Sequence, residues 1–563
     1  MERRPVPWPR VSKRQTLLLI ASNCVIAVLL YWPALHGTPV SDDLATLYLP
    51  QLQTLSWENL RAIVDPTSPV SATLFNYAPV HALLTALEIR LFGFDLLAFH
   101  LVNVAFHALV SGLLVVLFVR TGIPRAAALL GGLVFLVHPA NVEAIAWMNE
   151  LKTPSAMALA IGALLAHRRH PACAALLFVL ALLAKVQAAV ALPVLVALEW
   201  MRDPTLSRFG TLHRWRWVGV WALLFAAFAA VELPVLIGLG AIEHPRWGAD
   251  QLLHLRTMFA VAGRYLVMAF AGYGLSTGQE PPVAVSWADP WWLGGLLGLL
   301  LLGARTVHAL RRRRTEAAWW IWAAASYAPV SQAVATLWMV SDRYLYAVLP
   351  GLIGGLLLAG RDEVASWHSE ALRSRLKLAA AAVTLALAVV FAVRVRSERA
   401  PVWQSYERYL GDAARHYPDG TTAHVLRARQ YARTGDGAAA AEELRTARRR
   451  GWSWIGVVFT DPAFRAMSGD PQFQAVVREL TEPWLQQAKA RSEPTAYELR
   501  QLAQLHLWRG EAAEAAAARE RADALDRAAR SALGAPASGS PHDGTPPVAP
   551  DAAPVERGTS PPR

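Results

Sequence analysis

The feature that most constrains this chain is a series of long apolar runs separated by clusters of arginine. A run of about 20 apolar residues is long enough to cross the hydrocarbon core of a bilayer as a helix. We therefore predict an all-α polytopic membrane bundle of about eleven spans, in which several short runs are tilted or half-buried. The runs lie at roughly 16–35, 97–119, 125–138, 154–167, 171–184, 186–200, 217–240, 291–309, 317–338, 346–360 and 377–393.

The positive charge of the chain falls mainly between these runs. The formal net charge is +12, which by itself is compatible with a nucleic-acid partner. However, the arginines lie where the positive-inside rule places cytoplasmic residues, so orientation in a membrane explains the charge and we predict no nucleic-acid partner. The 22 tryptophans fit aromatic belts at the membrane interfaces and disfavour a soluble enzyme. Cys24 and Cys173 lie inside apolar runs, which excludes a disulfide framework.

The basic clusters predict an orientation. All of them are cytoplasmic if the apolar stretch 258–272 does not cross, so we treat it as an interfacial or re-entrant part of an outer loop at 241–290. The N-terminal run lacks a cleavage site and predicts a retained signal anchor. We expect a bacterial inner membrane, with residues 1–14 in the cytoplasm, a membrane domain at 15–395 and a periplasmic C-terminal part. The clusters are Arg120 with Arg125, Arg168 with Arg169, Arg202 to Arg216, Arg311 to Arg314, and Arg373 to Lys377.

The composition changes after about residue 395 to alanine, arginine, glutamate and glutamine. Two helical hairpins are expected, at 423–449 with a turn at Gly435-Asp436-Gly437, and at 494–526 with a turn at Gly510. Helix, glycine turn and alanine-rich helix at this length are typical of tetratricopeptide repeats, so we predict a repeat-like helical domain at 396–530. The intervening Asp461-Pro462-Ala463-Phe464 and its echo at 470–473 would complete the packing. Residues 531–563 are rich in proline, alanine, glycine and serine, which predicts a disordered tail.

The pair Asp42-Asp43 follows the first apolar run. Two adjacent carboxylates outside a membrane helix repel each other and gain nothing from lipid, so they favour a chemical or ligand-binding role. The alternative is that they cap a helix that starts near Leu44. The predicted topology places them on the outer side, together with the loop 138–154 and the turn 341–346.

Five stretches in this order resemble the transmembrane and tetratricopeptide-repeat O-mannosyltransferases, members of the GT-C glycosyltransferase superfamily. The resemblance covers residues 15–395 and extends to the repeats. Val186-Gln187 follow Lys185 where that family tends to have an acidic residue, and the usual glycine-arginine pair after Trp147 is absent. The stretches are Ser41-Asp42-Asp43, Phe99 to Asn103, His138-Pro139 leading to Glu143 and Trp147, Ala184-Lys185, and Asp342-Arg343-Tyr344-Leu345-Tyr346.

The resemblance implies transfer of a sugar, with mannose favoured, from a polyprenyl-phosphate donor to a protein or glycan acceptor on the outer face. Such a reaction needs a base for the acceptor and cations for the leaving phosphate. Asp42 or Asp43 is the candidate base, and the repeat domain would present a protein acceptor. Membrane lipid and the lipid-linked sugar are further expected partners. The candidate substrate-binding residues are Arg343 for the phosphate, Lys185 and Arg264 in second rank, Glu143 for the acceptor, and Asp342.

Several alternatives stay open at this point. Asp342 could neutralise Arg343 in a structural pair, Lys185 and Arg264 could extend to the interface, and Glu143 could stabilise a helix start. His100, Asn103 and His107 share a helix face, where hydrogen bonding between helices competes with binding of a divalent metal. We expect no certain metal site and no cofactor beyond the lipid-linked donor. A different class of function is a non-catalytic membrane scaffold that docks partners through its repeats.

Overall fold

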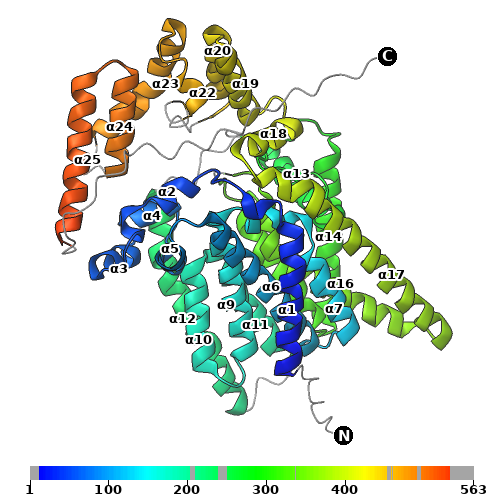
Figure 1. Ribbon diagram of the computed structural model, residues 1–563. Helices are drawn as coiled ribbons and strands as arrows, with labels where there is room; N and C mark the ends of the chain where they lie inside the picture. Colours follow the sequence, from blue (N-terminus) through cyan, green and yellow to red (C-terminus); the bar gives the residue numbers. More distant parts are fainter. Residues whose placement is uncertain are drawn as a thin grey trace, which may run out of the picture. The chain divides into compact units, whose positions relative to one another are not determined.

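The computed structural model describes residues 12–202, 209–238, 250–336, 338–452, 458, 461–490 and 496–532 (Figure 1). The described residues form helices and no strands, as the apolar periodicity predicts. They divide into two compact units, 1–423 and 424–563. Residues 1–11 of the predicted cytoplasmic N-terminus and 533–563 of the predicted tail lie outside the described residues.

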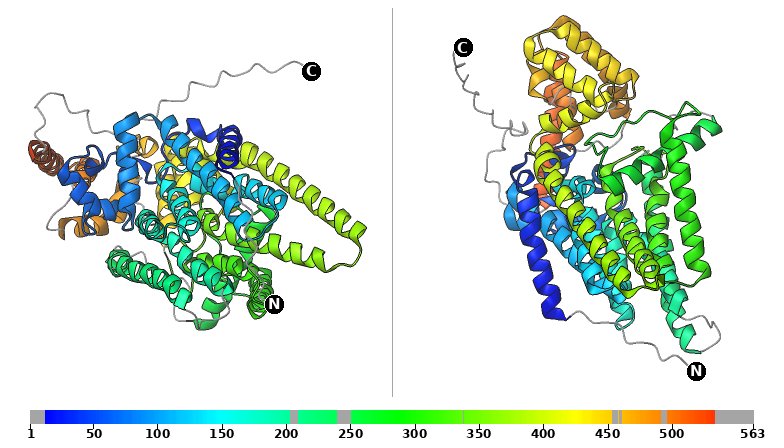
Figure 2. Two further views of the ribbon diagram at one scale, coloured as in Figure 1. Left: turned by 90° about the horizontal axis from the view of Figure 1, so that it is seen from below. Right: turned by 90° about the vertical axis from the view of Figure 1, so that its right-hand side faces the viewer.

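The first unit is a helical bundle with short helices at one end. Its longer helices lie side by side, and α1 packs along α6 (Figures 1 and 2). The helices are α1 Lys13–Tyr31, α2 Asp43–Leu47, α3 Trp57–Val64, α4 Pro69–Leu74, α5 Pro79–Phe92, α6 Leu96–Arg120, α7 Arg125–Leu136, α8 Val142–Ala146, α9 Lys152–Ala166, α10 Pro171–Ala184, α11 Ala191–Arg202, α12 Phe209–Gly238, α13 Gln251–Ala271, α14 Pro290–Arg311, α15 Glu316–Tyr327, α16 Leu345–Ser366, α17 Glu370–Arg394 and α18 Tyr406–His416. Short helical turns that matter below are η4 Met148–Leu151, η7 Asp342–Tyr344, η8 Val395–Arg399 and η9 Ala400–Trp403.

Many of these helices begin at a side chain that satisfies free backbone N–H groups. Ser12 and Gln15 form a reciprocal capping box at the start of α1. Asp95 caps α6 by accepting from the N–H of Leu97, and Asp250 caps α13 in the same way. The local sequence therefore sets where these helices begin.

Six helices in the described residues are long and apolar enough to cross a membrane, which indicates an integral membrane protein. A seventh span is formed if α7 and the following segment Pro139–Ala146, bent by 50°, count as one. Only 11% of the apolar windows of α14 and α17 is buried within the protein, so most of that surface needs lipid. The six are Lys13–Tyr31, Leu96–Arg120, Trp215–Ile237, Pro290–Arg311, Asp342–Ser366 and Glu370–Trp403.

This number is smaller than the expected eleven or so. The difference comes from the shorter runs, because α9, α10, α11 and α15 have 12 to 15 residues. A helix of that length spans about 18–23 Å, which is less than the hydrocarbon core of about 30 Å. The run expected at 317–338 is interrupted, since α15 ends at Tyr327 and turns follow.

Helix α13 covers the stretch that we expect not to cross. It is not among the candidate spans in the described chain. Its contacts lie with segments assigned to the outer side: Arg256 Nε donates to the carbonyl of Ala284 (3.0 Å), and His138 Nε2 donates to that of Ala269 (2.9 Å). Both ends of α13 therefore contact loops that the predicted topology places on one side of the membrane.

Two glycines bring α13 against α14. A Cβ atom on Gly263 would collide with the backbone oxygen of Trp291, and one on Gly295 with that of Phe259. The opposing atoms belong to the backbone, so these collisions could not be relieved by a change of side-chain rotamer. The two helices are therefore held at a spacing that any larger residue at these positions would increase.

The second unit contains the two helical hairpins that the sequence predicts. Gly435 and Gly510 adopt positive φ angles of 82° and 76° in their turns, where glycine is favoured. Phe464 and Phe473 from the Asp-Pro segments stack with ring centres 5.6 Å apart in the core between the hairpins. The helices are α19 Thr421–Thr434, α20 Gly437–Arg449, α22 Pro462–Arg465, α23 Pro471–Ala490, α24 Ala496–Trp508 and α25 Ala512–Ala532.

The compositional boundary at 395 does not coincide with the boundary between the units. Residues 396–423 belong to the first unit. Trp403 is 1% exposed and stacks on Trp147 with ring centres 6.2 Å apart, and Arg399 is 5% exposed. This segment therefore packs as part of the bundle although its composition resembles that of the second unit.

Candidate active site

The two aspartates at the start of α2 have different surroundings. Asp43 is 2% exposed, and its carboxylate accepts from the N–H of Val40 (2.9 Å) and from the N–H of Asn149 (3.0 Å). Ser41 before them has a positive φ of 54°, which turns the chain sharply at this point. Asp43 thus links the segment that carries Asp42 to η4. Neither of these two hydrogen bonds caps the N–H groups of α2.

The hydrogen bonding of the Asp42 carboxylate is incomplete. Its Oδ1 atom is buried and accepts no hydrogen bond within the described chain. The Nδ2 atom of Asn149 is also buried and donates none there. His81 Nε2 donates to Asn149 Oδ1 (3.0 Å) and so fixes the amide. Hydrogen bonding from the Asn149 side chain lowers the pKa of Asp42, but neither buried atom has a hydrogen bond of good geometry within the described chain, so a ligand would complete both.

Lys152 supplies a positive charge beside Asp42. Burial raises the pKa of Asp42 above its ordinary value, and the Lys152 ammonium opposes part of that rise. Burial also raises the pKa of Asp43, and the neighbouring Asp42 charge adds to it. Lys152 is 9% exposed, and its ammonium has no ion-pair partner among the described residues. Its charge acts on Asp42 and on Glu150, yet it forms an ion pair with neither in the described chain, and a buried cation in this position favours an anionic ligand.

A second group of charges adjoins this pair and is fully matched. The Arg343 guanidinium forms an ion pair with Glu143 and a second one with Glu150, whose Oε1 lies 3.3 Å from Nε. The backbone N–H of Arg343 and the hydroxyl of Ser341 also donate to Glu143, at 2.9 Å each. The Arg343 side chain is 11% exposed and lies over the ring of Trp147, 5.1 Å from its centre.

Lys185 belongs to the same network. Its Nζ atom lies 2.7 Å from Glu150 Oε2 and 2.7 Å from the hydroxyl of Thr153. Burial raises the pKa of Glu150, but the charges of Lys185, Lys152 and Arg343 outweigh that effect and the net shift is downward. Glu150 is therefore an ionised carboxylate that holds two cations in place.

Two of the expected site residues lie elsewhere. Asp342 accepts from Gln279 Nε2 (2.8 Å) and pairs with Arg399 (3.4 Å), and not with Arg343. Arg264 lies over the ring of Trp291 at 4.5 Å from its centre. The structure thus brings together Asp42, Asp43, Glu143, Lys185 and Arg343, and separates Asp342 and Arg264 from them.

The polar face of α6 joins helices. His107 Nε2 donates to the carbonyl of Leu136 (3.0 Å), and its Nδ1 lies 3.0 Å from the hydroxyl of Tyr346. Asn103 Nδ2 donates to backbone carbonyls around Trp147. Within the described chain, no group of three or more histidine, cysteine, aspartate or glutamate side chains is arranged to hold a metal ion.

Sequence reasoning missed Asn149, Glu150, Lys152 and His81. The first three follow Trp147 within five residues in the loop that we assigned to the outer side. A dense group of polar and charged residues at the edge of an apolar run was the available signal. His81 carried no comparable signal, because only the fold places it beside Asn149.

Comparison of the chain with protein-family models, with characterised proteins and with solved structures gives no match. The resemblance to O-mannosyltransferases therefore stays a prediction from the sequence stretches alone.

Proposed function

We propose that this chain is a membrane glycosyltransferase that moves a sugar from a polyprenyl phosphate to an acceptor hydroxyl on the outer side of the membrane. The observation that carries the proposal is a buried Asp42 carboxylate, one oxygen of which has no hydrogen bond within the described chain, together with the Lys152 charge that acts on it. A base and a cation side by side are what such a transfer requires. The resemblance to the GT-C superfamily supports the choice of reaction.

In the proposed step, the acceptor oxygen forms a bond to the anomeric carbon of the sugar. The bond from that carbon to the lipid phosphate breaks, and its electron pair leaves with the phosphate. Asp42 takes the proton of the acceptor hydroxyl, and Lys152 stabilises the charge on the phosphate. Burial raises the pKa of Asp42, which makes its carboxylate a stronger base than an exposed one.

The remaining charges have supporting roles in this proposal. Arg343 is already bound by two carboxylates, Glu143 and Glu150, so Lys152 is the better candidate to bind phosphate. Asp43 is a positioning residue, because both of its hydrogen bonds hold the loop that carries Asp42. The Nδ2 atom of Asn149 has no hydrogen bond of good geometry within the described chain and would donate to a sugar or phosphate oxygen of the bound donor.

The second unit supports a protein acceptor. Stacked helical hairpins offer surfaces on which peptides bind, and this unit contains two such hairpins. Mannose is the first sugar to assay because of the resemblance. The competing hypothesis of a non-catalytic scaffold uses the same hairpins and needs neither Asp42 nor Lys152.

The experiment is sugar transfer by the purified protein in detergent, with a mannosyl polyprenyl phosphate and candidate acceptors. We expect turnover by the wild type and by Asp95→Asn, a control in which asparagine can still cap α6. Asp42→Asn is expected to lose turnover. Equal turnover by Asp42→Asn and the control would refute the assignment of the base. No turnover by any protein, with full complementation in cells by Asp42→Asn, would favour the scaffold.

A further inference from the structure

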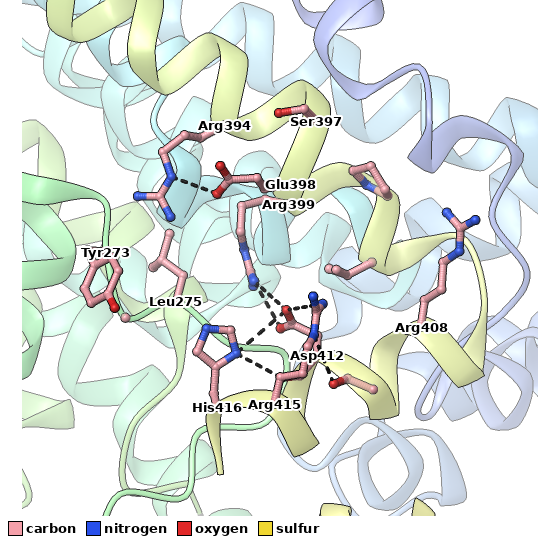
Figure 3. A pocket seen from close by; sticks show the side chains of 14 residues that line it. Tyr273, Leu275, Arg394, Ser397, Glu398, Arg399, Arg408, Asp412, Arg415 and His416 are labelled. Atoms are coloured by element: carbon pink, nitrogen blue, oxygen red, sulfur yellow. Dashed lines mark hydrogen bonds and ion pairs between the residues drawn. The ribbon is translucent and has the colours of Figure 1, made fainter. Parts of the chain in front are cut away.

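A cavity of about 870 Å³ lies in the first unit at the end of α17 (Figure 3). None of the residues proposed above for catalysis lines it. Its wall is formed by a loop after α13, by η8 and η9, and by one face of α18. The lining residues are Tyr273, Gly274, Leu275, Arg394, Ser397, Glu398, Arg399, Pro401, Val402, Arg408, Gly411, Asp412, Arg415 and His416.

The face of α18 that lines the cavity is basic. Arg408, Asp412 and Arg415 are spaced by four and three residues, which places them on one side of a helix. Gly411 lies on the same side and has no side chain to fill the space. Figure 3 shows Arg415 and His416 beside Asp412, with Arg408 farther along the helix.

Positive charge exceeds negative charge around the cavity. Four arginines line it, against the two carboxylates of Glu398 and Asp412. Arg394 pairs with Glu398 (2.9 Å), whereas Arg408 is exposed and donates to the neutral amide of Gln404. The Arg415 side chain is 72% exposed and lies 3.4 Å from Asp412. Two guanidinium groups are therefore accessible and only weakly compensated.

An independent observation comes from Arg399 in the wall of the cavity. This residue is 5% exposed. Its Nη atoms bind Asp412 (3.0 Å) and Asp342 (3.4 Å), but its buried Nε has no hydrogen-bond partner within the described chain. A buried charged donor without a partner is costly, and a ligand oxygen would satisfy it.

We propose that this cavity binds the phosphate group of a ligand. Guanidinium groups match phosphate oxygens in geometry and charge. The cavity lies at the C-terminal end of the candidate span Glu370–Trp403, of which α17 is the first part, so a lipid headgroup at the membrane edge is one source of the phosphate. A soluble phosphate ester is the other source. Leu275, Pro401 and Val402 add an apolar wall for the remainder of either ligand.

The test measures binding to the full-length protein in a neutral detergent by calorimetry. The probes are dihexanoylphosphatidylglycerol as the lipid source and glycerol phosphate as the soluble source. The variant is Arg408→Ala with Arg415→Ala, because both side chains are exposed: Arg408 donates to the neutral amide of Gln404, and Arg415 lies 3.4 Å from Asp412, a carboxylate that also pairs with Arg399. The matched control is Arg61→Ala with Arg90→Ala, which removes two exposed arginines outside the cavity.

We expect at least one probe to bind, with an affinity that falls about tenfold or more in the Arg408/Arg415 variant and stays within about twofold in the control. Tighter binding of the phosphatidylglycerol probe identifies the lipid source, and tighter binding of glycerol phosphate identifies the soluble source. Absence of binding to the wild type would overturn the proposal. Equal losses in the variant and the control would also overturn it. Because binding is the readout, the result is independent of any glycosyltransferase activity.

Discussion

Two neighbouring regions of the first unit, around Arg343 and around Asp42, differ in how completely their buried charges are paired. Around Arg343, each cation faces a carboxylate, and Glu150 alone holds both Arg343 and Lys185. Around Asp42, one carboxylate oxygen has no hydrogen-bond partner among the described residues, and the Lys152 ammonium acts on Asp42 through its charge without forming an ion pair there. A matched network stabilises a geometry, whereas unmatched groups are costly unless a ligand completes them. The comparison distinguishes charged residues that stabilise the fold from charged residues that are suited to bind or react with a ligand.

The largest expected effect tests the unmatched region. Asp42→Asn should lower the turnover of sugar transfer by about 10³-fold, because general-base catalysis contributes about 10² to 10⁴. The variant should remain folded, since it removes a buried charge that has few partners. Turnover and thermal unfolding measured on the same preparation check both statements. If Asp42→Asn loses both turnover and the folded state, Asp42 contributes to stability in the same way as the residues around Arg343.

The matched region should respond through stability. Arg343→Met leaves Glu143 and Glu150 buried without their shared cation, which should lower the free energy of unfolding by about 3–5 kcal/mol. Arg90→Met, at an exposed position on α5, is the control and should change it by less than about 0.5 kcal/mol. Chemical denaturation in detergent micelles gives both values. Similar values for the two variants would show that the network contributes little.

A smaller effect is expected at Lys152. Lys152→Gln should reduce kcat/KM by about 10- to 100-fold, because one charged contact to the leaving phosphate is lost. Lys152→Arg keeps the charge and should recover part of the loss. Steady-state kinetics with varied donor concentration measures this. If glutamine and arginine have the same effect, the charge is not what matters at this position.

The smallest effect concerns pH. Only the ionised form of Asp42 can accept a proton, so kcat/KM should fall as the pH decreases through its pKa. Burial raises that pKa above 3.8, so the decline should begin at a higher pH than for an exposed aspartate. A pH profile of kcat/KM over the range in which the protein stays folded checks this. A profile that declines no earlier than that of an exposed aspartate would contradict the raised pKa of Asp42.

Local features of the fold could be predicted from the sequence. The run at 97–119 became α6, and the glycines at 435 and 510 marked the hairpin turns, because helix periodicity and turn chemistry act over a few residues. The number of spans could not be predicted as well. Runs such as 171–184 are apolar but form helices of 14 residues, and apolar character does not distinguish a span from a buried core helix.

The candidate site was predictable only in part. The predicted topology placed Asp42 and Glu143 on one side of the membrane, and in the structure both lie near Arg343. Their partners could not be predicted, because Glu143 binds Arg343 across 200 positions of sequence. The alternative in which Asp342 neutralises Arg343 is not the arrangement in the structure, because Asp342 pairs with Arg399 and Arg343 pairs with Glu143 and Glu150. Side chains that are neighbours in sequence diverge, so only the fold decides which charges meet.

The glycine contact between α13 and α14 is connected to Glu143 in the candidate active site by a short series of contacts. Gly295 sets the distance to α13, where the Tyr265 hydroxyl accepts from the N–H of Ser341 (3.0 Å), and Ser341 donates to Glu143. Since α14 is a lipid-facing candidate span, a bilayer of altered thickness would shift it and strain this linkage. We therefore expect the turnover of the reconstituted protein to depend on the acyl-chain length of its lipids. Gly295→Ala should lower turnover in the same way as a bilayer whose thickness does not match α14.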